Sequence, residues 1–76
     1  MSKRPAITGA QAIKAFCELG FVVARISGSH HILKKEGHPY RLSVPVHADK
    51  TLKTGTLSGL LRNAGCTPDE FWEVLK

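Results

Sequence analysis

The sequence predicts one α+β domain in which helices cover one face of a three-stranded antiparallel sheet and leave the other face open. Apolar side chains have helical spacing over residues 8–19, three short segments typical of strands follow between residues 21 and 45, and helical spacing returns over residues 55–75. Strands joined by short turns and flanked by helices are typical of a two-layer α+β fold. The 76 residues are enough for a single domain, 1–76, with a modest core.

The first helix has a recognisable start and end. Thr8 and Gln11 have the spacing of a capping box, in which a hydroxyl and an amide satisfy each other's exposed backbone donors. The helix is therefore expected to begin near Gly9 and to run to about Leu19, where Gly20 supplies the left-handed residue that ends it. Residues 1–7 are expected to be a disordered extension.

Three strands are expected next. Residues 21–26 are rich in β-branched side chains and too short for a helix, and 27–29 form a turn. The second strand covers 30–35, a turn follows through 36–39, and the third strand runs from Tyr40 to Val44 or Pro45. In the third strand Leu42 and Val44 alternate with polar neighbours, which predicts a sheet with only one buried face.

Two helices complete the chain. Leu57, Leu60 and Leu61 keep helical spacing up to Gly65, which is expected to end the second helix. Gly59 within that helix costs about 1 kcal/mol relative to alanine, which suggests a packing reason such as close approach to the sheet. A second capping box at 67–70, with proline at the first helical position, predicts a short C-terminal helix.

The charge balance favours an anionic partner. Eleven Lys and Arg residues against six Asp and Glu residues give a formal net charge of +5, with nucleic acid as the leading candidate. The basic residues gather between 21 and 65, whereas 66–76 are mainly acidic, so this last segment is not expected on the same ligand. A solvated basic surface without a ligand is the alternative.

Cysteine usage and hydropathy predict a soluble cytoplasmic protein. Cys17 and Cys66 form no close pair and no disulfide framework, as expected of a reducing compartment. No apolar run is long enough for a signal peptide or a membrane helix. We therefore expect neither export nor membrane association.

The adjacent histidines His30 and His31 are the most informative chemical feature. Successive strand residues point to opposite faces, so the two side chains have different roles. If Leu33 faces the core, His31 does too, and His30 and Lys34 lie on the open face. The opposite register would bury His30 and Lys34 together, which is why we favour the first.

His30 is the candidate general acid or base. An imidazole with a pKa of about 6.5 can take a proton from a ribose 2′-hydroxyl or return one to a leaving oxygen, and this chemistry needs no metal. The alternative is a surface histidine without a task. His31 is interpreted as a structural side chain, and His38 and His47 as solvated ones, although His47 is also placed to contact a phosphate. Close ligand pairs of the kind that hold zinc are missing, so no metal is expected.

Two backbone segments are candidate anion sites. The turn at Gly28 and Ser29 has amides that can face a phosphate, although such a dipeptide is ordinarily only a turn. The start of the second helix, at Gly55 and preceded by Lys50 and Lys53, is the stronger candidate because free amides and basic side chains converge there.

Several segments together resemble the HicA toxin family in order and spacing. They are the Gly-Ser-His-His segment 28–31, the Val-Pro-Val-His segment 44–47, residues 52–57 and residues 60–65. The resemblance covers roughly residues 8–75. It departs from the usual family form in the residues before Thr8 and at Ser58, where a basic residue is common.

The resemblance implies a double-stranded-RNA-binding-domain-like α-β-β-β-α fold, here with an added C-terminal helix. It also implies a ribosome-independent mRNA endonuclease, the toxin of a type II toxin–antitoxin system, neutralised by a HicB-type antitoxin. The catalytic histidine of the family corresponds to His30. The RNA-binding residues are then expected to be Ser29, Lys34, Arg41, Lys50, Lys53 and Arg62.

Two alternatives remain at this point. One is a non-catalytic RNA-binding module of the same fold, which binds RNA shape and backbone without cutting. The other is a degenerate toxin copy that still binds its antitoxin. No cofactor is expected under any of these hypotheses.

Overall fold

Six elements follow one another in a computed structural model that describes residues 6–75. They are α1 (Gly9–Glu18), β1 (Val22–Ser27), β2 (His30–Lys34), β3 (Leu42–Pro45), α2 (Thr54–Ala64) and α3 (Pro68–Leu75). The three strands form one antiparallel sheet in the order β1-β2-β3. This confirms the expected α+β fold, including the extra C-terminal helix. The third strand is shorter than expected, because Tyr40 and Arg41 precede it.

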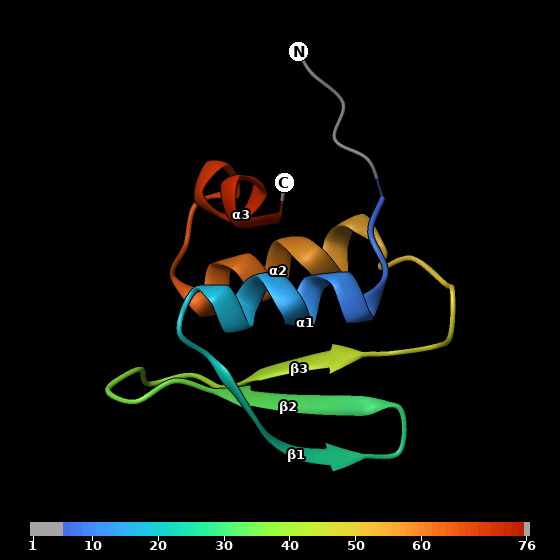
Figure 1. The fold of residues 1–76 in the computed structure, drawn as a ribbon, viewed down its shortest axis with the longest axis horizontal. Helices are drawn as coiled ribbons and strands as arrows, with labels where there is room; N and C mark the ends of the chain where they lie inside the picture. Colours follow the sequence, from blue (N-terminus) through green and yellow to red (C-terminus); the bar gives the residue numbers. More distant parts are fainter. Residues whose placement is uncertain (1–5, 76) are drawn as a thin grey trace.

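The molecule has a helix layer and a sheet layer. All three helices lie on one side of the sheet, with β3 nearest to them and β1 farthest (Figure 1). The core between the layers is centred on three phenylalanines, with the ring of Phe16 lying 6.0 Å from that of Phe21 and 5.0 Å from that of Phe71. Leu33, Leu42 and Val44 supply the sheet side of this core, and each is completely buried, which is why the sheet has only one covered face.

Both predicted capping boxes are present. The backbone N–H of Gln11 donates to Thr8 Oγ1 (3.2 Å), and the backbone N–H of Thr8 donates to Gln11 Oε1 (2.8 Å). Thr67 and Glu70 make the same pair of bonds at the start of α3 (3.1 and 2.8 Å). Gly65 ends α2 with a left-handed φ of 73°. These local signals fix where the helices begin and end.

The structure shows which glycine allows a close approach between backbone segments, and it is not the one expected from the sequence. Gly59 has nothing within 4 Å of the point where a Cβ atom would lie, so the expected close approach to the sheet does not exist. The close approach occurs at Gly9, the first residue of α1, which is buried against the carbonyl oxygen of Pro45. The contact holds the start of α1 against the end of β3.

The start of the chain is tied to the fold from Ile7 onwards. The expectation of a disordered extension falls mainly on residues 1–5, which lie outside the described residues. Ile7 is only 3% exposed, and its carbonyl oxygen accepts a hydrogen bond from the backbone N–H of Leu52 (2.7 Å). Thr8 then bridges to Thr51. The segment before α1 therefore packs against the segment before α2.

Candidate RNA-binding and catalytic site

The pairing of the strands decides where the two adjacent histidines point. His31 lies opposite the buried Val44, and Leu33 lies opposite the buried Leu42, so both face the helices. His30 therefore faces away from the helices, as expected from the sequence. We call this outer side of the sheet the open face; its strand residues are Val22, Arg25, Ser27, His30, Ile32, Lys34, Ser43 and Pro45.

His30 is accessible to a ligand. It is the first residue of β2 and is exposed, with Ser27 and Pro45 as its partners on the neighbouring strands. The tight turn at Gly28 and Ser29 places it there; Gly28 has a left-handed φ of 59°, and the Ser29 carbonyl accepts a hydrogen bond from the N–H of Val46 (2.7 Å). The imidazole is thus held at a sheet corner and open to solvent.

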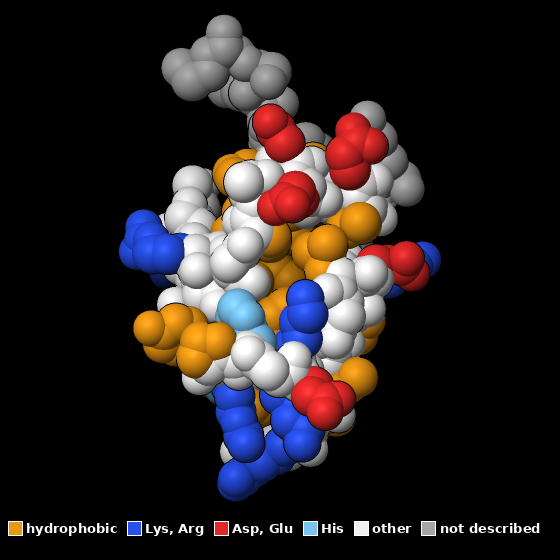
Figure 2. All heavy atoms as spheres, turned by 90° about the vertical axis from the view of Figure 1, so that its left-hand side faces the viewer, with side chains coloured by type: hydrophobic (Ala, Val, Ile, Leu, Met, Phe, Trp, Pro, Cys, Tyr) orange, Lys and Arg blue, Asp and Glu red, His pale blue; other side chains and the backbone are white. Residues whose placement is uncertain are grey.

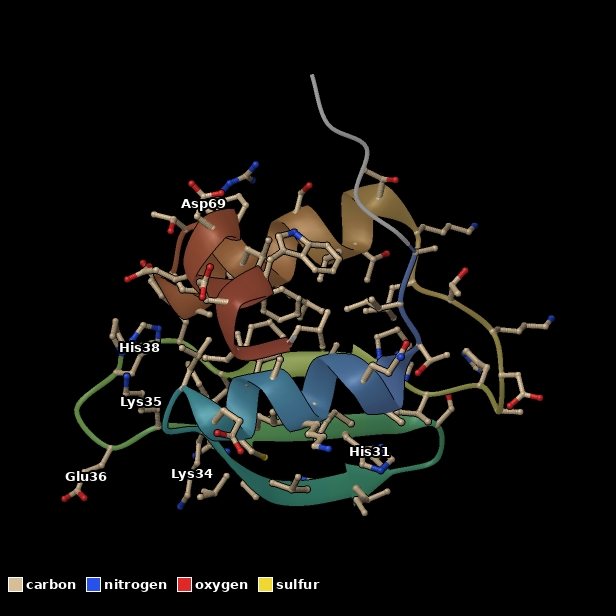
Figure 3. The ribbon with its side chains drawn as sticks, turned by 45° about the horizontal axis from the view of Figure 1, so that its top comes forward. His31, Lys34, Lys35, Glu36, His38 and Asp69 are labelled. Atoms are coloured by element: carbon tan, nitrogen blue, oxygen red, sulfur yellow. The ribbon has the colours of Figure 1, made fainter. Side chains whose placement is uncertain are left out.

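His31 differs from its neighbour in burial and bonding. Its residue is half-buried, and its Nδ1 atom is buried without a hydrogen-bond partner in the described part of the chain. Figure 3 shows it at the opposite end of the sheet from Lys34, Lys35 and Glu36. A ring on the helix side of the sheet cannot reach an RNA on the open face. The arrangement supports a structural role for His31.

Basic side chains accompany His30 on the open face. Lys34 lies at the far end of the same strand and points away from the helices (Figure 3). Arg41 is exposed just before β3. Figure 2 shows Lys and Arg side chains gathered at the sheet end of the molecule and several acidic side chains at the helix end. The open face is therefore the part of this surface suited to a polyanion.

Arg25 joins this group although it was not among the expected RNA-binding residues. Val23 pairs with Leu33 on the helix side, and in a regular strand Arg25, two residues on, would point the same way. The register shifts between the two, so Arg25 pairs with Ile32 and belongs to the open face. A bulge of this kind has no local sequence signal, which is why strand alternation alone does not find it.

A hollow next to His30 is lined by two further residues expected at the site, Lys50 and Lys53. It has a volume of about 300 Å³ and lies between the end of β3 and the start of α2. Its lining consists of Pro45, His47, Lys50, Thr51, Leu52, Lys53 and Thr56. Because Pro45 is the strand partner of His30, the hollow adjoins the catalytic candidate.

The start of α2 leaves donors free for an anion in this hollow. Its N-cap residue, Lys53, has an extended backbone and makes no capping hydrogen bond with its side chain. The first amides of a helix have no partners within the helix and favour negative charge. With Lys50, Lys53 and His47 around them, they form a place for a phosphate group. His47 therefore belongs with the candidate site.

Arg62 is not brought to the same place. It lies in the last turn of α2, about 12 Å along the helix axis from the start at a rise of about 1.5 Å per residue. This end of α2 packs near His38, whose Nε2 atom lies 2.6 Å from the carbonyl oxygen of Asn63. A single short RNA segment over His30 would not touch Arg62. Its role in RNA binding stays a prediction.

The other reactive groups do not suggest a different chemistry. In the described residues, no three His, Cys, Asp or Glu side chains come together in a way that could hold a metal ion. Burial, together with the nearby Glu70 carboxylate, raises the pKa of the Cys66 thiol, which therefore stays protonated and weakly nucleophilic. No helix among residues 6–75 has the length and apolar character needed to cross a membrane.

Comparison with known proteins assigns the family. Residues 9–66, well over half of the chain, match the family described as the HicA toxin of bacterial toxin–antitoxin systems. The chain belongs to the HicA toxin family. Among curated proteins, no sequence matches it.

The HicA match covers the candidate site completely. His30, the basic open face and the hollow at the start of α2 all lie within residues 9–66, whereas α3 lies beyond them. As a HicA toxin, the chain is one half of a toxin–antitoxin pair, and the family implies an antitoxin partner.

Proposed function

We propose that this HicA toxin is a metal-independent endoribonuclease that cleaves mRNA in the cytoplasm, with His30 as its catalytic residue. The observation that carries the proposal is the exposed imidazole of His30 on a basic sheet face, beside a hollow lined by two lysines. Phosphates bound by such groups bring a ribose within reach of the ring. His31, on the other side of the sheet, does not take part.

The chemistry uses the two protonation states of one imidazole. Neutral His30 takes the proton of a ribose 2′-hydroxyl, whose oxygen attacks the adjacent phosphorus; a 2′,3′-cyclic phosphate forms as the bond from phosphorus to the 5′-oxygen breaks, and the leaving 5′-oxygen takes up a proton from the protonated ring or from water. In the protonated state, His30 instead gives a proton to the leaving oxygen. General acid–base catalysis of this kind contributes about 10²–10⁴-fold. Lysine and arginine side chains stabilise the charge that develops on the phosphate oxygens.

The binding residues fall into two groups around His30. Lys34 and Arg25 lie on the open face, with Arg41 exposed just before β3. Lys50, Lys53 and His47 line the hollow, and Ser29 lies in the turn directly before His30. An RNA that passes over His30 can contact both groups, because Pro45 joins the face to the hollow. The lysine side chains are expected to supply most of the affinity, as phosphate contacts do in general.

Replacement of His30 tests the assignment. The His30→Ala variant is expected to cleave RNA at least about a hundredfold more slowly than the wild type in buffer with a chelator, because it loses its proton carrier. His38→Ala is the matched control, since that ring packs against Phe21 at the other end of the sheet. A folded His30→Ala variant that cuts as fast as the wild type contradicts the proposal.

The same assay separates the alternatives. A non-catalytic RNA-binding module would shift RNA in a salt-sensitive manner and never shorten it. A degenerate toxin copy would bind an antitoxin but would neither bind nor cleave RNA. Growth arrest on expression of the wild type, and not of His30→Ala, is expected only if RNA is cut.

We also propose that a HicB-type antitoxin inhibits by covering the open face. Its Asp and Glu side chains would lie opposite the Lys and Arg residues and shield His30. A complex that left the open face free would contradict inhibition by occlusion.

A further inference from the structure

The strand β1 is uncovered along its whole length. All six of its residues are exposed, among them Val22 (54%), Val23 (40%) and Ile26 (60%). The other edge strand, β3, differs, because Leu42 and Val44 are buried and Gly9 of α1 lies against the Pro45 carbonyl. The helices thus cover one edge of the sheet and leave the β1 edge without cover (Figure 1).

A free edge of this kind is suited to accept another strand. Edge strands present unpaired N–H and C=O groups, and proteins normally protect them with charges, bulges or a very short length. β1 has six residues, one charged side chain and one bulge, and it still exposes three large aliphatic side chains. Two of these side chains, Val23 and Ile26, are neighbours on the helix side of the sheet, and an exposed apolar patch of this kind indicates an interaction surface.

The two sides of β1 have different chemistry. Val23 and Ile26 pair with Leu33 and His31, so they form an apolar shelf on the helix side of the sheet. Arg25 lies on the open face, next to β2, which carries Lys34. A strand added beside β1 would therefore meet the apolar Val23 and Ile26 on the helix side, and on the open face the charge of Arg25 between Val22 and Ser27.

We propose that β1 is the anchor of the antitoxin, which adds a strand to this edge and makes the sheet four-stranded. The added strand would alternate apolar residues, packed on Val23 and Ile26, with acidic residues facing Arg25. The inference rests on the proposed inhibition by an antitoxin, and it names how that partner is held. Neighbouring strands lie about 4.8 Å apart, so the added strand would lie only two such spacings from β2, close enough for the same antitoxin also to cover His30.

A second copy of this chain is a poorer fit for the same edge. Two β1 strands paired with each other would bring their arginines, and the lysines behind them, onto one surface. Like charges on facing strands oppose pairing. An acidic strand from a different protein removes this repulsion, and the isolated toxin is therefore expected to be a monomer in solution.

Hydrogen exchange of the β1 amides tests the pairing directly. The toxin is measured alone and in complex with a purified HicB-type antitoxin. Amides of β1 that do not bond to β2 are expected to exchange freely in the toxin alone and to be slowed by about a hundredfold or more in the complex. Equal exchange rates of these amides in the two states would overturn the proposal.

A charge on the apolar shelf tests the side-chain contacts. Ile26→Asp is expected to weaken antitoxin binding by about tenfold or more, because it places an unpaired carboxylate against an apolar surface. Tyr40→Asp is the matched control, since Tyr40 is 59% exposed and does not belong to β1. Both variants should keep the wild-type melting temperature within a few degrees, because neither side chain is in the core.

The two proposals fail in different ways. Ile26→Asp should still cleave RNA at the wild-type rate, since Ile26 points to the helix side of the sheet and His30 to the opposite side. If Ile26→Asp binds the antitoxin as tightly as Tyr40→Asp does, the strand-addition proposal is overturned while the nuclease proposal stands. If the wild type does not cleave RNA, the nuclease proposal fails. The hydrogen-exchange measurement then still tests whether the antitoxin adds a strand to β1.

Discussion

At the scale of single residues, the proposed proton-transfer chemistry depends on two neighbouring histidines that lie in opposite environments. His30 has solvent on its side of the sheet, and His31 has the helices. The difference arises because successive side chains of a strand point to opposite faces of the sheet; the two residues are chemically identical. The imidazole of His30 is available for proton transfer, whereas that of His31 has a buried nitrogen with no hydrogen-bond partner among residues 6–75.

Replacing His31 by leucine should stabilise the protein without affecting activity. A buried polar atom that lacks a partner costs about 1–3 kcal/mol, and Nδ1 of His31 is such an atom within residues 6–75. We expect His31→Leu to raise the free energy of unfolding by about 1 kcal/mol, measured by urea denaturation. RNA cleavage should be unchanged. Loss of cleavage in a folded His31→Leu protein would show that His31 shares the proton transfer.

At the scale of the elements, one close backbone contact joins α1 to β3 beside the candidate site. The start of α1 reaches the end of β3 because Gly9 has no side chain, and the Cβ atom of any other residue would overlap the Pro45 carbonyl oxygen. This contact positions Pro45, the residue that joins His30 to the hollow at α2. The start of α1 thus supports the candidate site through Pro45, although it is not itself part of that site.

Two alanine substitutions of glycine should have opposite effects. Gly9→Ala overlaps the neighbouring strand and is expected to lower the free energy of unfolding by about 2 kcal/mol. Gly59→Ala has open space and a helical position, so it should raise that free energy by about 1 kcal/mol. Chemical denaturation of both variants under the same conditions checks this. A stabilised Gly9→Ala protein would contradict the packing of α1 on β3.

At the scale of the whole molecule, basic and acidic side chains lie in different layers. Within residues 6–75, most Lys and Arg residues lie on the sheet layer and around the start of α2, whereas α3 begins with Asp69 and Glu70. A polyanion is therefore attracted to the side that carries His30 and repelled from the C-terminal helix. Under the proposed function, this division of charge orients an RNA before any specific contact forms.

RNA binding should accordingly weaken steeply with salt. For single strands, the slope of log K against log salt is about −0.7 per neutralised phosphate. Lys34→Ala is expected to reduce the magnitude of this slope by about 0.7, whereas Lys14→Ala, on α1 in the helix layer, should leave it unchanged. Fluorescence anisotropy with the inactive His30→Ala protein measures binding without cleavage. Equal slopes for the two lysine variants would contradict a binding surface on the open face.

The sequence alone determined the elements, their caps and the side of β2 on which His30 lies. Capping boxes, helix-ending glycines and strand alternation are interactions between residues a few positions apart, so they can be found in the order of the letters. The same local signals placed Lys50 and Lys53 before a helix start. These features account for most of the fold and for the centre of the candidate site.

Only the tertiary structure decided which surfaces are covered and which side chains meet. It moved Arg25 to the open face through a bulge, separated Arg62 from His30, brought His47 into the hollow and left β1 bare. Each of these outcomes depends on the distances between elements that are remote in the chain. Packing geometry sets those distances, and no short stretch of sequence carries them.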